Sequence, residues 1–153
     1  MTMPPASRFV SEVSLEIRRD TDVQIAQLKS KQFASTNGCS AQVCWKVAIV
    51  VSEAASNIVK FAGHGTILLR TGCTQDDTPF IEMIAKDNGP GIDNLELAIR
   101  DGFSENRDLS KDENVLQRRG LGSGIGAMLR LADKLKINRP DEGGTEVIAR
   151  FFC

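Results

Sequence analysis

Three polar residues in one predicted helix have types and a spacing that suit phosphate chemistry. Glu53, Asn57 and Lys60 are spaced i, i+4 and i+7, so they share one face of a helix. The amide oxygen of Asn57 can be one of the few protein ligands of a phosphate-held Mg²⁺. Glu53 can orient or deprotonate an attacking hydroxyl, and Lys60 can place a cation near phosphate oxygens. From this helix alone, the solvated face of an amphipathic helix is the simpler interpretation.

A glycine-containing segment after a predicted strand is suited to holding a flat ring. Residues 87–92 read D-N-G-P-G-I and end at Ile92. Gly89 and Gly91 allow the backbone to approach a ligand closely and to adopt positive φ. Asp87 can accept a hydrogen bond from an amino group such as that of adenine. A Pro-Gly turn after a strand explains these residues equally well.

A second glycine-rich segment, residues 120–125, precedes a predicted helix and is suited to binding an anion. It lacks the Gly-Lys-Ser/Thr of a Walker loop, and no strand leads directly into it as in a dinucleotide-binding motif. Each glycine costs about 1 kcal/mol relative to alanine inside a helix. The glycines therefore favour binding over stability. The candidate residues here are Gly120, Leu121, Gly122, Gly124 and Ile125.

Taken in order, these segments resemble a known set of nucleotide-binding motifs. The last member is Gly144-Thr145, where a threonine hydroxyl can help close a base pocket; alone, it is simply a β-branched residue after a turn. The series E-x-x-x-N-x-x-K, D-x-G-x-G-I, a variable loop, G-x-G-x-G and G-T resembles the N, G1 and G2 boxes of the GHKL (Bergerat-fold) ATPases. That family includes histidine kinases, gyrase, MutL, heat-shock chaperones and anti-sigma-factor kinases. The resemblance runs from about Ser40 to the C-terminus.

Chain length and histidine content favour one branch of this family. The chain has no room for the transducer domain of gyrase or MutL, and its single histidine, His64, lies in a Gly-His-Gly turn. We therefore expect the phosphate acceptor on another protein. A single short domain resembles the bacterial switch serine kinases of the RsbT, RsbW and SpoIIAB type. Residues 52–65 and 120–133 are most similar to the RsbT (stressosome) branch.

The resemblance implies a role for each matching position. Glu53 would be the catalytic base, Asn57 the Mg²⁺ ligand, and Asp87 the acceptor for the adenine amino group, with Thr145 nearby. ATP and Mg²⁺ are the implied cofactors. The remaining nucleotide-binding candidates are Lys60, Gly89, Gly91, Ile92, Gly120, Leu121, Gly122, Gly124 and Ile125. One cation of the loop would contact the γ-phosphate, and the sequence does not choose among Arg107, Lys111, Arg118 and Arg119.

The resemblance also implies protein partners. The expected substrate is a serine or threonine on a STAS-domain antagonist in a stress-signalling complex. A PP2C-type phosphatase or a sigma factor is a further expected partner, and relatives often form homodimers through the sheet. The alternative function is an anti-sigma factor whose nucleotide state selects its partner. A structural domain that keeps the pocket only as a remnant is disfavoured, because all the polar motif positions are retained.

Hydrophobic periodicity predicts one α/β domain over residues 1–153, and the resemblance to the GHKL ATPases implies that it has the two-layer Bergerat fold. Its sheet should be mixed and mostly antiparallel, with helices on one face and solvent or a partner on the other. Strands are predicted at 9–17, 66–71, 80–85, 135–137 and 145–152. Helices are predicted at 20–37, with a cap at Asp20 or Thr21, at 40–62, at 93–100 and from 120–126 onward, with a polar lid at 101–119.

Composition excludes several other classes of protein. With a net charge of −1, the chain lacks the charge excess expected for binding nucleic acid or an acidic membrane. No apolar run approaches the roughly 18 residues of a membrane span, and the N-terminus lacks the pattern of a secretory signal. We therefore expect a cytoplasmic protein. Its four cysteines, Cys39, Cys44, Cys73 and Cys153, are expected to be unpaired thiols, mostly small core residues.

Overall fold

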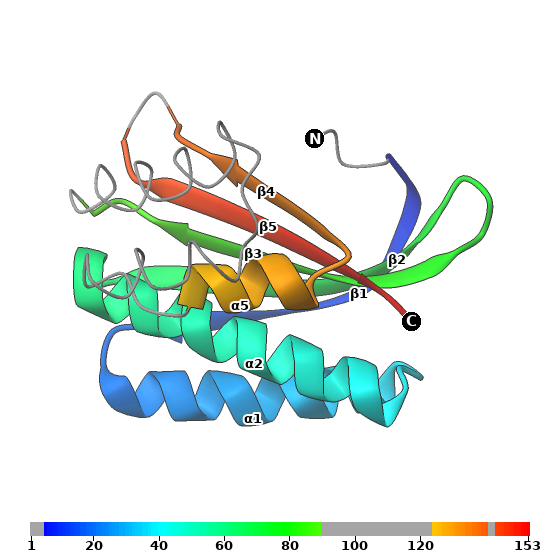
Figure 1. Ribbon diagram of the computed structural model, residues 1–153, viewed down its shortest axis with the longest axis horizontal. Helices are drawn as coiled ribbons and strands as arrows, with labels where there is room; N and C mark the ends of the chain where they lie inside the picture. Colours follow the sequence, from blue (N-terminus) through cyan, green and yellow to red (C-terminus); the bar gives the residue numbers. More distant parts are fainter. Residues whose placement is uncertain (1–4, 90–123, 141–142) are drawn as a thin grey trace.

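The computed structural model describes residues 5–89, 124–140 and 143–153, which form a sheet with helices against one face (Figure 1). The strands are β1 (Ala6–Ile17), β2 (Gly65–Thr74), β3 (Pro79–Asp87), β4 (Lys134–Asn138) and β5 (Thr145–Phe152). The helices are α1 (Asp20–Thr36), α2 (Ala41–Asn57) and α5 (Gly124–Leu131), and a π-helical turn, η1 (Ile58–Ala62), continues α2. The predicted two-layer α/β architecture is confirmed.

The sheet has the order β1-β2-β3-β5-β4, and each of these neighbouring pairs is antiparallel. The described strands therefore form an antiparallel sheet, and the expectation of a mixed sheet is wrong for them. The connections between the strands explain this arrangement. α1 and α2 run in opposite directions, so the chain returns to the end of the sheet where β1 finished, and Ile17 pairs with Gly65. β5 likewise starts where β3 ends, with Thr145 opposite Asp87.

The start of α1 differs from the sequence prediction. Asp20 is already the first helical residue, and Arg19 occupies the cap position with extended dihedral angles. The carboxylate of Asp22 accepts hydrogen bonds from the backbone N–H groups of Arg18, at 2.9 Å, and Arg19, at 3.2 Å. An acidic side chain in the first turn thus satisfies N–H groups just before the helix, and neither Asp20 nor Thr21 acts as the cap.

Both ends of the second helical segment follow the sequence prediction. The hydroxyl of Ser40 caps α2 by accepting a hydrogen bond from the N–H of Val43 at 3.2 Å. At the other end, η1 stops at Gly63, which has a φ of +81° and donates its N–H to the carbonyl of Ile58 at 2.8 Å. Glycine suits that left-handed conformation because it has no Cβ. The π-turn itself has no signal in the sequence.

The core lies between the helical layer and one face of the sheet. α2 contributes Val47, Val50 and Ala54, which are almost fully buried. Val43 of α2 and Phe61 of η1 are only half-buried. Alternate residues of the strands complete the core, among them Ile67, Leu69, Ile81, Met83, Ala149 and Phe151.

The open face of the sheet, the one away from the helices, carries a buried ion cluster. Glu82, which is 1% exposed, accepts hydrogen bonds from the guanidinium groups of Arg150, at 2.6 Å, and Arg70, at 2.7 Å. The ring of Phe9 lies 3.7 Å from the Arg70 guanidinium, and that of Phe80 lies 4.0 Å from the Arg150 guanidinium. This face therefore holds charges that are paired and covered by aromatic rings.

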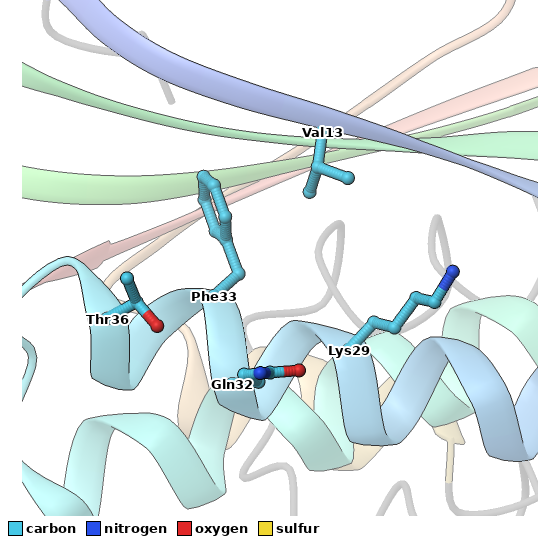
Figure 2. Close-up of a pocket in the computed structure, with 5 residues that line it drawn as sticks. All are labelled: Val13, Lys29, Gln32, Phe33 and Thr36. Carbon is cyan, nitrogen blue, oxygen red and sulfur yellow. The ribbon is translucent and has the colours of Figure 1, made fainter.

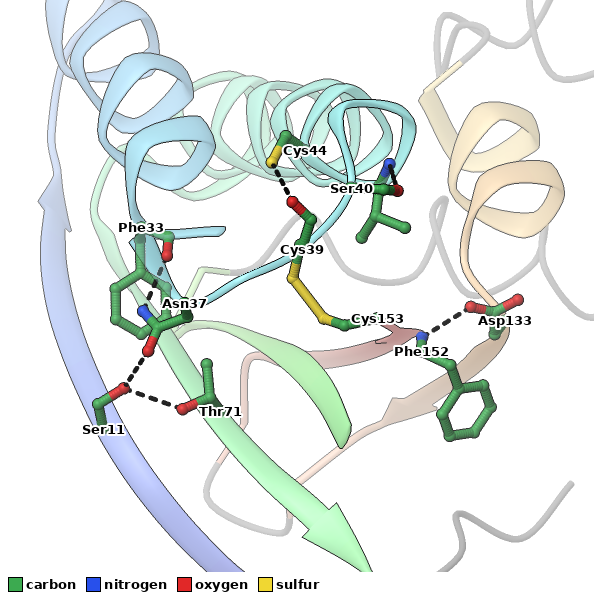
Figure 3. Close-up of a disulfide and its surroundings, with 11 residues drawn as sticks. Ser11, Phe33, Asn37, Cys39, Ser40, Cys44, Thr71, Asp133, Phe152 and Cys153 are labelled. Atoms are coloured by element: carbon green, nitrogen blue, oxygen red, sulfur yellow. Dashed lines mark hydrogen bonds between the residues drawn. A yellow bond between two sulfur atoms is a disulfide. The ribbon is translucent and has the colours of Figure 1, made fainter. Parts of the chain in front are cut away.

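The expectation of four unpaired thiols is wrong for two cysteines. Cys39, in the α1–α2 connection, forms a disulfide with Cys153, and their Cα atoms lie 4.9 Å apart (Figure 3). Cys44 and Cys73 are outside any disulfide. The two bonded residues are 114 positions apart in sequence, so only the three-dimensional fold brings them together. Within the described helices, no segment combines the length and hydrophobicity needed to cross a membrane.

Candidate nucleotide site

α2 and α5 bring two of the predicted motifs into contact. Glu53 of α2 is half-buried. It lies beside Gly124, the first described residue of α5. A Cβ added to Gly124 would sit 2.8 Å from Oε2 of Glu53. The absence of a side chain at Gly124 therefore leaves room for the Glu53 carboxylate beside α5.

Asn57 and Lys60 lie on either side of the change from α2 to η1. Asn57 is the last residue of α2 and is half-buried, one helical turn after Glu53, as its predicted role requires. Lys60 is exposed, and its Nζ lies 5.2 Å from the centre of the Phe61 ring. A π-turn is wider than an α-helical one. The spacing in sequence therefore does not by itself place Lys60 in line with Glu53 and Asn57.

Asp87 lies at the end of β3, between Gly65 of β2 and Thr145 of β5. Its Oδ1 accepts a hydrogen bond from the N–H of Gly89 at 3.0 Å, and its carboxyl also interacts with the N–H of Thr145. Burial raises the pKa of Asp87 above its ordinary value, and these two hydrogen bonds oppose the rise only in part. A half-buried carboxyl with remaining acceptor capacity can receive an amino group.

Glycines around Asp87 permit close approach of the backbone. A Cβ on Gly89 would overlap Ala62 of η1, and one on Gly144, where φ is +89°, would overlap the carbonyl oxygen of Asp87. Gly65 was not among the predicted site residues. In the structure a Cβ there would lie 2.6 Å from the Lys86 carbonyl oxygen. The G-x-G pattern at residues 63–65 is the sequence feature that could have predicted this close approach of Gly65 to β3.

Several predicted residues are placed by the structure and others are not. Thr145 is 4% exposed and pairs with Asp87, and Ile125 is 1% exposed in α5. The rest of the predicted nucleotide-binding set lies outside the described residues: Gly91, Ile92, Gly120, Leu121 and Gly122. The predicted helix at 93–100, the lid at 101–119 and its candidate cations Arg107, Lys111, Arg118 and Arg119 also lie outside them.

The described residues fit a magnesium nucleotide by the chemistry of their donors. Asn57 offers a hard amide oxygen, which is a type of ligand that Mg²⁺ accepts. Asp87 offers a half-buried acceptor, and Gly89 and Gly144 hold the backbone close around it. In the described ranges no cluster of three or more His, Cys, Asp or Glu side chains forms a protein-only metal site.

A separate hollow of about 340 Å³ lies between β1 and α1 (Figure 2). Val13 and Phe33 form its apolar side, and Lys29, Gln32 and Thr36 form the rest of its lining. None of these residues belongs to the predicted motifs, so this hollow is distinct from the candidate nucleotide site.

Comparison with known proteins agrees with the geometry of the site. Residues 18–151 match the model of the histidine kinase-like ATPase domain. The chain belongs to this family. The match includes α2, α5 and both strands that meet at Asp87 and Thr145. The resemblance to the GHKL ATPases that was inferred from the motifs is thereby confirmed.

Two individual proteins are similar over most of the chain. The serine/threonine-protein kinase RsbT of Bacillus subtilis (strain 168) is 27% identical over 135 residues, which cover 88% of this chain and 92% of RsbT. A chain in the crystal structure of the SiaB–SiaC complex from Pseudomonas aeruginosa superposes with a TM-score of 0.57. It is 16% identical, and the superposition covers 95% of this chain and 91% of that chain. The latter likeness concerns the fold.

Proposed function

We propose that this histidine kinase-like ATPase domain is a cytoplasmic serine/threonine protein kinase. It transfers the γ-phosphate of ATP to a STAS-domain antagonist in a bacterial partner-switching stress pathway. The observation that carries the proposal is the close approach of Glu53 to Gly124, because it puts a carboxylate beside the last glycine of the segment expected to bind phosphate. The similarity to RsbT, a serine/threonine kinase, supports the reaction class.

Each placed residue has a role in the proposed transfer. Glu53 accepts the proton of the attacking serine or threonine hydroxyl and orients its oxygen. Asn57 supplies one oxygen ligand to Mg²⁺, and Asp87 with the Thr145 strand end holds the adenine amino group. Mg·ATP, when bound, supplies the transferable phosphoryl group and neutralises its charge. Gly124 keeps the space beside Glu53 open.

A protein partner is part of the proposal. The only histidine, His64, lies in the Gly-His-Gly turn after η1, where it is exposed and hydrogen-bonds Glu16 at 3.0 Å. The proposed acceptor is therefore on a second protein. The solved neighbour contains SiaB together with SiaC, which supports looking for a protein that binds this domain.

The test is phosphate transfer from γ-labelled Mg·ATP to a STAS-domain protein encoded beside the gene. We expect acid-stable label on serine or threonine, and we expect the exposed carboxylate variant Glu12→Ala to transfer as well as the wild type. An ATP-dependent complex with a sigma factor, without any label on the STAS protein, would contradict the kinase and favour an anti-sigma binding protein.

A further inference from the structure

The Cys39–Cys153 disulfide joins the helical layer to the sheet at the end opposite the nucleotide site. Cys39 directly precedes Ser40, the cap of α2, whereas Glu53 and Asn57 lie toward the other end of that helix. Cys153 directly follows β5, whereas Thr145 begins it. The bond therefore fastens two elements that both extend to the candidate site, without touching the site itself.

The two sulfur-bearing residues are accessible to a small thiol. Cys153 is exposed and Cys39 is half-buried. An incoming thiolate can thus attack the sulfur of the exposed residue Cys153 and release Cys39 as the leaving group.

The backbone around each cysteine is held by hydrogen bonds that do not need the disulfide. The N–H of Cys39 donates to the carbonyl of Ala34, and the N–H of Cys153 donates to the carbonyl of Pro79, each at 3.0 Å. The N–H of Phe152 donates to Asp133 at 2.8 Å. These hydrogen bonds do not involve sulfur, so we expect them to keep both cysteines close enough to pair again after the bond is reduced.

Further contacts fix the α1–α2 connection to the sheet on its other side. The side chain of Asn37 donates to the carbonyl of Phe33 at 2.8 Å and accepts from the hydroxyl of Ser11 at 3.0 Å. Ser11 also bonds Thr71 at 2.9 Å. These contacts hold the connection against β1 without involving the sulfur atoms, which favours reversible pairing over permanent separation.

We propose that Cys39 and Cys153 form a reversible thiol–disulfide site that sets how firmly the helical layer is fastened to the sheet. In reduction, one thiolate of a dithiol bonds to the Cys153 sulfur as the Cys39–Cys153 bond breaks, and its second thiolate then displaces Cys153. The dithiol ends as a disulfide, and its two protons end on Cys39 and Cys153. A disulfide oxidant reverses the exchange.

The proposed compartment makes reversibility the expected behaviour. Disulfides in a reducing cytosol are usually transient, catalytic or redox-sensing. This step rests on the proposed cytoplasmic kinase, whereas accessibility and backbone support are independent of it. The consequence is local: the buried thiol of Cys44 donates to the carbonyl of Cys39 at 3.7 Å, so loosening the connection should expose Cys44.

The first test is thiol labelling of the folded protein with N-ethylmaleimide, followed by peptide mass spectrometry. We expect Cys39 and Cys153 to be protected after oxidised dithiothreitol and labelled after reduced dithiothreitol, over repeated cycles without denaturant. Cys44 should label faster in the reduced protein. Labelling of both cysteines in every state would show that no disulfide forms. Protection that ends only on unfolding would show a permanent bond. Either result overturns the proposal.

The second test is thermal unfolding in both redox states. The disulfide closes a loop of more than 100 residues, so we expect reduction to lower Tm by about 5–15 °C. Cys73→Ser should keep this difference, and Cys153→Ser should melt at the reduced temperature in both states. Equal melting of the two wild-type states would contradict the proposal. Failure to bind ATP in both states would instead contradict the proposed kinase.

Discussion

At the scale of single residues, Asp87 offers the most direct test of the candidate adenine pocket. Its carboxyl is half-buried, receives two backbone N–H groups and still has acceptor capacity for a ligand. Asp87→Asn keeps one accepting oxygen and removes the charge. We expect ATP affinity, measured by calorimetry, to fall by about 1–3 kcal/mol. Affinity equal to that of the wild type would exclude Asp87 from the base pocket.

The raised pKa of Asp87 also predicts how stability depends on pH. The native state binds this proton more tightly than the unfolded chain, whose reference value is 3.8. The contribution of Asp87 is therefore fully present below that value and is lost as the pH rises through the native pKa. Urea unfolding across this range should show the wild type losing stability relative to Asp87→Asn. A constant difference, or a gain, would contradict the assigned burial.

Substituting Gly124 tests the role of Glu53 as the proposed general base while the Glu53 side chain is kept. A Cβ at this position would press on the carboxylate of Glu53, which is the movable end of that side chain. Gly124→Ala should leave the free energy of unfolding within about 1 kcal/mol, because alanine suits a helix better than glycine does. Transfer should fall by roughly 10²-fold through misplacement of the carboxylate. Wild-type transfer by this variant would argue against Glu53 acting at Gly124.

At the scale of secondary structure, the helices and strands themselves were predictable from residue patterns, whereas their local irregularities were not. Alternating apolar residues marked β1, and Ser40 and Asn37-Gly38 marked helix ends, because these are short-range signals. The π-turn at η1 and the capping of α1 by Asp22 depend on competing local hydrogen bonds that several sequences allow. Lys60 is the site residue most affected by such an irregularity.

The ion cluster of β2, β3 and β5 provides a prediction about the sheet. Glu82 is the shared partner of Arg70 and Arg150, and the Arg150 side chain is 4% exposed. Removing a partner from a buried ion pair typically costs about 3–5 kcal/mol. Glu82→Gln should therefore lower the free energy of unfolding, measured in urea, by that amount. The control substitution Glu12→Gln, at an exposed residue, should change this free energy little. A loss of unfolding free energy below about 1 kcal/mol would contradict the stabilising role of the ion cluster.

At the scale of the whole molecule, the family and the layer arrangement followed from the order of motifs, and the long-range contacts did not. The motifs singled out Glu53 and Asp87 as candidates, but only the fold shows Gly124 beside Glu53 and Thr145 beside Asp87. The Cys39–Cys153 bond is the same kind of case, since 114 positions separate its partners. Sequence spacing reports on neighbours within one element, and contacts between elements depend on packing.

The central claim at this scale is that one domain both binds ATP and uses Glu53 to transfer its phosphate. The most direct measurement compares Glu53→Ala with the wild type in two assays: ATP affinity by calorimetry and transfer of label to the STAS-domain protein. We predict affinity within about threefold of the wild type and transfer lower by about 10²–10⁴-fold, the usual contribution of a general base. Undiminished transfer by Glu53→Ala would contradict the account.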